Sequence, residues 1–216
     1  MTRRILLAVL LLVPAAVPAA DKSGPAEKKD DPSKASTDPP NVPLQLIVKA
    51  HETYELNTGG DQPRQYQEKL QASVKNGKFL SATPMDPALE MEIKNTSKSS
   101  IQIWESGDGT EFDVTLTGNF AMSVKAKSKF EGPAVPNKVV TIPAGKSHKL
   151  TLSSLSYGYR GEEKRAYIAD TGGYELRISF KTAVSPAPAN AKPQANGFGE
   201  VKLKSAPVTF RVTRPT

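Results

Sequence analysis

Short segments in which apolar and polar residues alternate run through most of this 216-residue chain, and this period constrains its fold more than any other feature. Successive side chains of a β-strand point to opposite faces, so alternation marks strands with one buried face. Gly, Pro, Asn and Asp separate the segments, as in antiparallel sheets. The pattern therefore predicts an all-β protein, an antiparallel sandwich or barrel. The apolar residues that define the predicted strands are Leu44, Leu46 and Val48; Leu89, Met91 and Ile93; Ile101 and Ile103; Phe112, Val114 and Leu116; Phe120, Met122 and Val124; Val140 and Ile142; Leu150, Leu152 and Leu155; Tyr174, Leu176, Ile178 and Phe180; Val201 and Leu203; and Val208, Phe210 and Val212.

One segment, residues 61–76, departs from this period. Tyr66, Leu70 and Val74 are spaced four residues apart, which places them on one face of a helix. We therefore predict one amphipathic helix, inserted between two strands and packed on the edge of the sandwich. The residues expected to delimit it are Asp61 as the cap, Pro63 in the first turn, and Asn76 and Gly77 at the stop.

The first 20 residues have the three parts of a secretory signal peptide. Two arginines precede an apolar run at 5–13, and small residues follow up to Ala19 and Ala20. The run is shorter than the roughly 20 residues that a membrane-spanning helix needs. We expect cleavage after Ala19 or Ala20 and an exported protein, periplasmic or secreted, without a transmembrane segment. Because the chain has no cysteine, we also expect no lipid anchor and no disulfide.

Residues 21–43 are rich in Pro, Ser, Lys and Asp and contain no aromatic residue. Such a segment buries too little apolar surface to offset its ordering entropy, so we predict a disordered tether. The domain itself is then predicted to span residues 44–216. The formal charge of the whole chain is +7, with the lysines spread along it. That distribution favours weak attraction to anionic surfaces and disfavours nucleic acid as a partner.

Three motifs follow one another in the order found in immunoglobulin-like domains. A strand ends in Asn-Thr-Ser at residues 95–97, and a Pro-Ala-Gly-Lys-Ser turn follows at 143–147. Asp170 and Tyr174, in the segment DTGGYEL, then resemble a corner in which a tyrosine hydroxyl bonds to upstream backbone.

This order resembles small exported bacterial immunoglobulin-like domains, and also the BsuPI family of proteinase inhibitors, over residues 89–180. The resemblance implies an immunoglobulin-like antiparallel β-sandwich. The predicted helix at about 61–76 and the long Pro-rich loop before the last strand depart from the compact pattern of these domains. The resemblance also implies proteinase inhibition as one function. No inhibitory residue is carried over, because no reactive-loop motif is matched.

The chain offers little for nucleophilic catalysis. It has no cysteine, no G-x-S-x-G elbow and only two histidines, His51 and His148, each expected as a half-exposed strand residue. Gly145-Lys146-Ser147 lacks the first glycine of a phosphate-binding P-loop, because Val140 stands there. We therefore expect neither an enzyme nor a cofactor.

Four carboxylates gather between residues 105 and 113, and two interpretations stay open. Glu105, Asp108, Glu111 and Asp113 would supply oxygen ligands to calcium, or paired carboxylates to a hydrolase. Alternatively, Asp108-Gly109 forms the turn of a simple β-hairpin.

Aromatic residues mark the candidate partner surface. Trp104, the only tryptophan, has the parity opposite to Ile101 and Ile103, so a regular strand exposes it and only a bulge turns it into the core. An exposed tryptophan is typical of a ligand or partner surface. The other candidates are Tyr157, Tyr159 and Arg160 in a glycine-punctuated loop, and Phe198 at the end of a long Pro-rich segment, 184–199, expected to be mobile.

The sequence therefore predicts an exported, non-catalytic binding module of the cell envelope, whose partner is a protein, a glycan or a cell-wall polymer. The alternatives are a calcium-dependent or carboxylate-based hydrolase on a β-sandwich, and a proteinase inhibitor.

Overall fold

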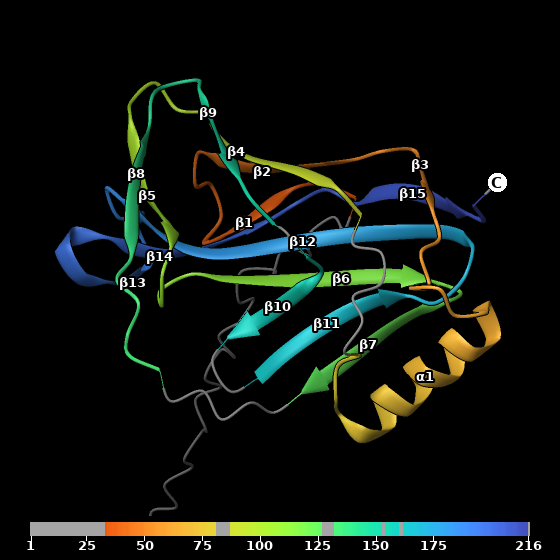
Figure 1. The fold of residues 1–216 in the computed structure, drawn as a ribbon. Coiled ribbons are helices and arrows are strands. Elements are labelled where there is room, and N and C mark those ends of the chain that lie inside the picture. The colour runs from red at the N-terminus through yellow and green to blue at the C-terminus, as the bar shows by residue number, and fades with distance from the viewer. Residues whose placement is uncertain (1–32, 81–86, 127–131, 153, 160–161, 216) are drawn as a thin grey trace, which may run out of the picture.

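The computed structural model describes residues 33–80, 87–126, 132–152, 154–159 and 162–215. The predicted signal peptide and most of the predicted tether lie outside these residues. The described chain forms three β-sheets, a short 3-10 helix and one α-helix (Figure 1). The prediction of an all-β protein with one inserted helix is confirmed.

The largest sheet is built on β12 (Gly172–Ser185), the longest strand. Strands β6 and β5 pair along one edge of β12, and β15 and β14 pair along the other. The bounds of the other strands in this sheet are β1 (Ser36–Asp38), β3 (Thr53–Glu55), β5 (Ile101–Ser106), β6 (Glu111–Gly118), β8 (Lys138–Ile142), β13 (Lys192–Pro193), β14 (Gly199–Lys204) and β15 (Val208–Thr213).

Two three-stranded sheets pack on one face of this large sheet. One has the order β2 (Leu44–Ala50), β4 (Leu89–Asn95), β9 (Ser147–Leu150), and the other β10 (Ser156–Tyr159), β11 (Glu162–Ile168), β7 (Ala121–Ala126). The core between the sheets is formed by the apolar side chains that occupy every second position of the strands, as the alternation predicts. Its largest fully buried side chains include Leu46, Ile93, Leu176, Ile178 and Phe180.

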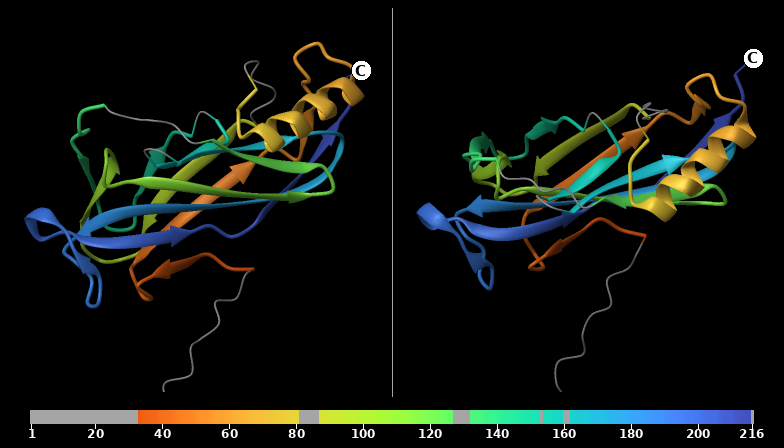
Figure 2. Two further views of the ribbon diagram at one scale, coloured as in Figure 1. Left: turned by 90° about the horizontal axis from the view of Figure 1, so that it is seen from below. Right: turned by 60° about the horizontal axis from the view of Figure 1, so that its bottom comes forward.

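The helix α1 (Pro63–Asn76) covers the outer face of β7 and β11, where Tyr66 and Leu70 pack in a second small cluster. Views of the molecule place α1 and β1 on opposite sides (Figure 2). The prediction of which α1 residues face inward was wrong in part. Val74 is 46% exposed, and Ser73 is buried instead.

The ends of α1 follow the prediction at one terminus only. Gly77 has a φ of 59° and caps the last turn, as expected of a glycine stop. The N-cap is Gln62, which makes no side-chain cap, so Asp61 is not the cap. The Asp61 carboxylate instead binds the ammonium of Lys69 at 2.6 Å.

The last part of the predicted tether belongs to the domain. Ser36–Asp38 forms β1, which pairs with β14, and Val42 is only 7% exposed. Composition missed this because β1 is held by backbone hydrogen bonds, which every residue type except proline can make in full.

Two of the sequence motifs join the ends of strands. The hydroxyl of Tyr174 donates to the backbone oxygen of Asp170 at 2.5 Å, which is the contact of a tyrosine corner. Desolvation of this buried phenol raises the pKa of Tyr174 to about 12. The fully buried Asn95 donates to the carbonyl oxygens of Ser99 and Ile142, and so ties β4 to the end of β8.

Candidate ligand-binding site

The candidate site arises where two strands share one edge of β12. Ile103 in β5 pairs with Val184, and Glu111 in β6 pairs with Lys181. Both strands are antiparallel to β12, so they run in the same direction and do not fold back on each other. The predicted hairpin at Asp108-Gly109 is therefore wrong. Residues 107–110 instead form a turn that leaves the edge of β12 and returns to it, because β5 diverges to pair with β8.

A buried hydroxyl fills the gap between the two ladders. Thr182 is fully buried, and its hydroxyl donates to the backbone oxygen of Trp104 at 2.6 Å. The hydrogen bond gives a partner to the backbone carbonyl of Trp104 at the point where β5 separates from β12. The end of β5, just before the turn, is thus anchored to β12 by a side chain.

Trp104 lies on the face opposite to Ile103, as its parity predicts, yet it is only 8% exposed. Of the two alternatives that the sequence left open, exposure and burial, the structure shows burial. A register shift does occur between Trp104 and Ser106, but burial comes from a different cause. Phe198 and Ala183 pack on the indole, and the ring centroids of Trp104 and Phe198 lie 5.4 Å apart.

The segment that carries Phe198 is ordered by its own contacts. The prediction of a long mobile loop at 184–199 is wrong, because β12 continues to Ser185 and β13 pairs with β14. The 3-10 helix Ala195–Gly197 follows, and the backbone nitrogen of Gln194 donates to the backbone oxygen of Phe198 at 2.8 Å. Phe198 is only 7% exposed.

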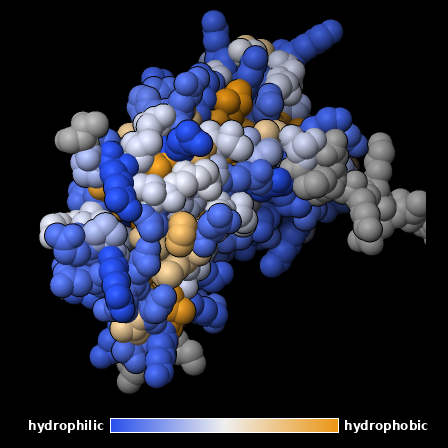
Figure 3. All heavy atoms as spheres, turned by 90° about the vertical axis from the view of Figure 1, so that its right-hand side faces the viewer, coloured by the Kyte–Doolittle hydropathy of each residue, from blue (hydrophilic) through white to orange (hydrophobic). Residues whose placement is uncertain are grey.

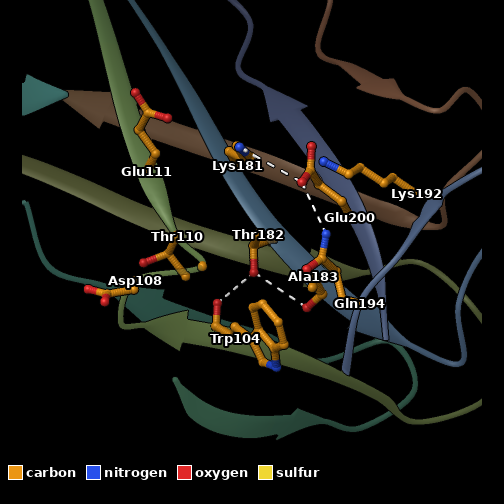
Figure 4. Close-up of a pocket in the computed structure, with 11 residues that line it drawn as sticks. Trp104, Asp108, Thr110, Glu111, Lys181, Thr182, Ala183, Lys192, Gln194 and Glu200 are labelled. Carbon is orange, nitrogen blue, oxygen red and sulfur yellow. Dashed lines mark hydrogen bonds and ion pairs between the residues drawn. The ribbon is translucent and has the colours of Figure 1, made fainter. Parts of the chain in front are cut away.

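A pocket of about 280 Å³ lies between the 107–110 turn, β12 and the β13–β14 hairpin (Figure 4). Its lining joins residues that are distant in the chain and mostly polar. The lining residues are Trp104, Asp108, Gly109, Thr110, Glu111, Lys181, Thr182, Ala183, Lys192, Gln194 and Glu200. There is no spare room on the tryptophan side, since a Cβ added at Gly109 would come within 2.3 Å of the indole.

Side chains of both charges line this pocket, and its two lysines lie on the same wall as Glu200. Glu200 accepts a hydrogen bond from the Gln194 side chain at 3.2 Å and lies 3.8 Å from the ammonium of Lys181. Figure 4 shows Lys192 on the same wall, while Asp108 and Glu111 lie on the other side of Thr182. The pocket therefore offers donors and acceptors together.

Of this lining, the sequence indicates Trp104, Asp108 and Glu111, but not the wall that runs from β12 to β14. The sequence does indicate that Lys181 points outward, because it alternates with the apolar residues of the longest predicted strand. Nothing in the sequence indicates that Gln194 and Glu200 face it, because that depends on how β13 and β14 pair.

The predicted acidic metal site does not form among the described residues. They contain no group of three or more His, Cys, Asp or Glu side chains that could hold a metal ion. Glu105 binds Lys138 at 2.5 Å and His148 at 2.9 Å, and these two partners lower the pKa of its carboxyl. The carboxylate of Asp108 accepts from the backbone nitrogen of Val135, and Asp113 faces Ser179 across the ladder.

The remaining candidates lie elsewhere. Tyr157 is half-buried in β10 against the main core, with the Lys164 ammonium 5.7 Å from its ring centroid. The side chain of Tyr159 and the whole of Arg160 fall outside the described residues. His148 is a partly exposed strand residue, as expected, whereas His51 is exposed and lies outside the strands.

Comparisons of the chain with known protein families, with curated proteins and with solved structures gave no match. Within the part of the chain that is described, no helix is long and apolar enough to cross a membrane. The face at the α1 end is mostly hydrophilic, with small separate apolar patches (Figure 3). The site therefore has to be interpreted from its own chemistry.

Proposed function

We propose that this protein is an exported, non-catalytic binding module of the cell envelope and that the pocket beside Trp104 holds part of a glycan or cell-wall polymer. The observation that carries the proposal is the lining itself. Ammonium, amide, hydroxyl and carboxylate groups surround one opening on paired strands. Sugar hydroxyls donate and accept hydrogen bonds, so a wall with both kinds of partner suits them.

The site is built to hold a ligand without rearrangement. One wall stands on β12 and β14, which are paired over Ser179–Val184, and the end of β5 is fixed to β12 through Thr182. A pre-formed polar site loses little entropy when a ligand binds. Its lining groups, which are lysine, carboxylate, amide and threonine side chains, supply hydrogen bonds and charge to a bound ligand.

The finer fold assignment is part of the same proposal. The tyrosine corner between Tyr174 and Asp170 and the packed antiparallel sheets support an immunoglobulin-like domain. Such sandwiches present ligands at strand ends and connecting turns, which is where this pocket lies.

The single tryptophan of the chain lines the pocket, so its fluorescence reports ligand binding directly. The purified protein would be titrated with soluble peptidoglycan fragments and neutral oligosaccharides, with calorimetry in parallel. We expect a saturable change in emission, weakened about tenfold in Lys181→Ala, which corresponds to about 1.4 kcal/mol. Lys94→Ala, an exposed lysine on β4, is the matched control.

An emission change that is equal in wild type, Lys181→Ala and Lys94→Ala would reject the pocket as the binding site. Absence of both heat and emission change with every glycan would reject the ligand class.

A further inference from the structure

We propose that a second pocket, at an open edge of β4, binds a short peptide that has free termini and an aliphatic side chain. This pocket has a volume of about 340 Å³, in the range of small-ligand sites. It shares no lining residue with the pocket beside Trp104, so it is a different site. Its lining combines aliphatic side chains with two lysines and two glutamates.

The edge of β4 is open beside this pocket because the pairing with β9 stops before β4 ends. The last pair of this ladder is Met91 with Leu150, whereas β4 extends to Leu89. At the opposite end of the ladder, the backbone nitrogen of Asn95 donates to the backbone oxygen of Lys146 at 2.9 Å. Every second residue from Asn95 therefore directs its backbone N–H and C=O toward the β9 side, and Leu89 is one of them. Within the described ranges, no strand pairs with Leu89 on that side.

An unpaired strand edge is a place where an extended peptide can add to a sheet. One peptide residue opposite Leu89 would donate to its carbonyl oxygen and accept from its backbone nitrogen, as a further residue of β9 would. Ile47 in β2 and Leu152, which follows β9, are half-buried and line the same pocket. They offer apolar surface, so the side chain bound there is aliphatic.

The fold leaves four charged side chains of this pocket without partners. Lys49 lies directly opposite Glu90, and Lys149 lies directly opposite Glu92. Among the residues that the structure describes, none of these four side chains makes a hydrogen bond or an ion pair. Their charges are therefore available to a ligand.

The arrangement of these charges favours a ligand that carries both signs. Glu90 and Glu92 lie on the same face of β4, the central strand, and Lys49 and Lys149 flank them on β2 and β9. An ammonium group between two carboxylates relieves their mutual repulsion, and a carboxylate group binds a lysine through a charged hydrogen bond. A peptide with free termini has both groups, together with the backbone that the edge of β4 lacks. A phosphate group or a neutral sugar has neither the ammonium group nor this backbone.

The test measures binding of the tripeptide Ala-Leu-Ala to the purified protein by titration calorimetry. The same peptide is also measured with an amidated carboxyl terminus and with an acetylated amino terminus. The lysine variant is Lys49→Gln/Lys149→Gln, and the glutamate variant is Glu90→Gln/Glu92→Gln.

The control variant is Lys75→Gln/Lys98→Gln, which removes two exposed lysines that lie outside the pocket. Circular dichroism melting verifies that all three variants fold.

We expect the wild type to bind the free tripeptide and to lose about tenfold in affinity on amidation, and about tenfold on acetylation. Each modification removes one charged contact. Amidation should cost less than about twofold in the lysine variant, and acetylation less than about twofold in the glutamate variant. The control variant should retain both tenfold losses.

Absence of tripeptide binding to the wild type would overturn the proposal. Effects of amidation and acetylation that are the same in the wild type and in all variants would also overturn it, because these side chains would then not hold the termini. Neither result bears on the pocket beside Trp104, which is tested with glycans, Trp104 emission and Lys181→Ala.

Discussion

The ring of Trp104 lies 5.4 Å from the ring of Phe198, at an interplanar angle of 31°, and the two side chains enclose Ala183 in a small cluster of their own. This contact joins β5 to the segment between β13 and β14. It closes one side of the candidate pocket and buries the only tryptophan of the chain. The pocket and the stability of this end of the molecule therefore depend on the same contact.

Phe198→Ala should open this cluster. Removing a buried phenylalanine costs about 3 kcal/mol in unfolding free energy, from lost burial and the cavity left behind. Trp104 emission should also shift to longer wavelength as water reaches the indole. Urea unfolding followed by circular dichroism and fluorescence measures both. Phe120→Ala, at a phenylalanine that is 38% exposed, should change stability by about 0.5 kcal/mol or less. Equal losses in the two variants would contradict the assigned packing.

Gly109→Ala should strain the turn that borders the pocket. A Cβ at this position meets the indole of Trp104 at 2.3 Å, so the ring or the turn has to shift, at a cost of about 1–3 kcal/mol. Thermal melting compares it with Gly173→Ala, where a Cβ would meet no atom within 4 Å. An unchanged melting temperature in Gly109→Ala would show that the turn is not held against the ring.

Tyr174→Phe removes the hydroxyl that donates to Asp170 and should cost about 1 kcal/mol at neutral pH. Because the pKa of Tyr174 in the folded state, about 12, exceeds the usual 10.0, the neutral phenol stabilises the fold below pH 10. That contribution is lost as pH rises toward 12. Urea unfolding at pH 7 and pH 11 should show a smaller alkaline loss in Tyr174→Phe than in wild type. Tyr157→Phe, whose hydroxyl is exposed, should retain the wild-type loss.

Glu105→Gln should weaken the link between β5, β8 and β9. Lys138 and His148 lower the pKa of Glu105, so its carboxylate stabilises the fold above the usual value of 4.5. That stability is lost as pH falls through the lowered pKa. We expect the variant to be about 1 kcal/mol less stable at pH 7, and less sensitive to acid than wild type. Chemical unfolding at pH 7 and pH 3 measures this, with the exposed Glu90→Gln as control. Parallel pH dependence in wild type and Glu105→Gln would exclude the linkage.

Local pattern was sufficient for the longest strand and for the existence of the helix. Leu176, Ile178 and Phe180 alternate in the sequence and are all buried in β12, because strand geometry sends every second side chain to the same face. Tyr66 and Leu70 were likewise placed correctly on the inner face of α1. Val74 was not, because which of two adjacent helical positions is buried depends on the surface that the helix covers, and β7 and β11 supply that surface.

The pocket depended on pairing that no local pattern encodes. Asp108-Gly109 has the composition of a hairpin turn, but β12 offers its edge to both flanking strands, so the chain continues along that edge. Trp104 has the parity of an exposed residue, but Phe198 covers it.

The sequence by itself determined the all-β class, the single inserted helix and the parity of the long strands, since these follow from the spacing of apolar residues within a few positions. Tertiary structure alone decided that Trp104 is buried, that β1 extends the domain, and that Lys181 and Glu200 share a wall. Those outcomes depend on contacts between segments far apart in the chain, and their register is set by the packing of the whole sheet.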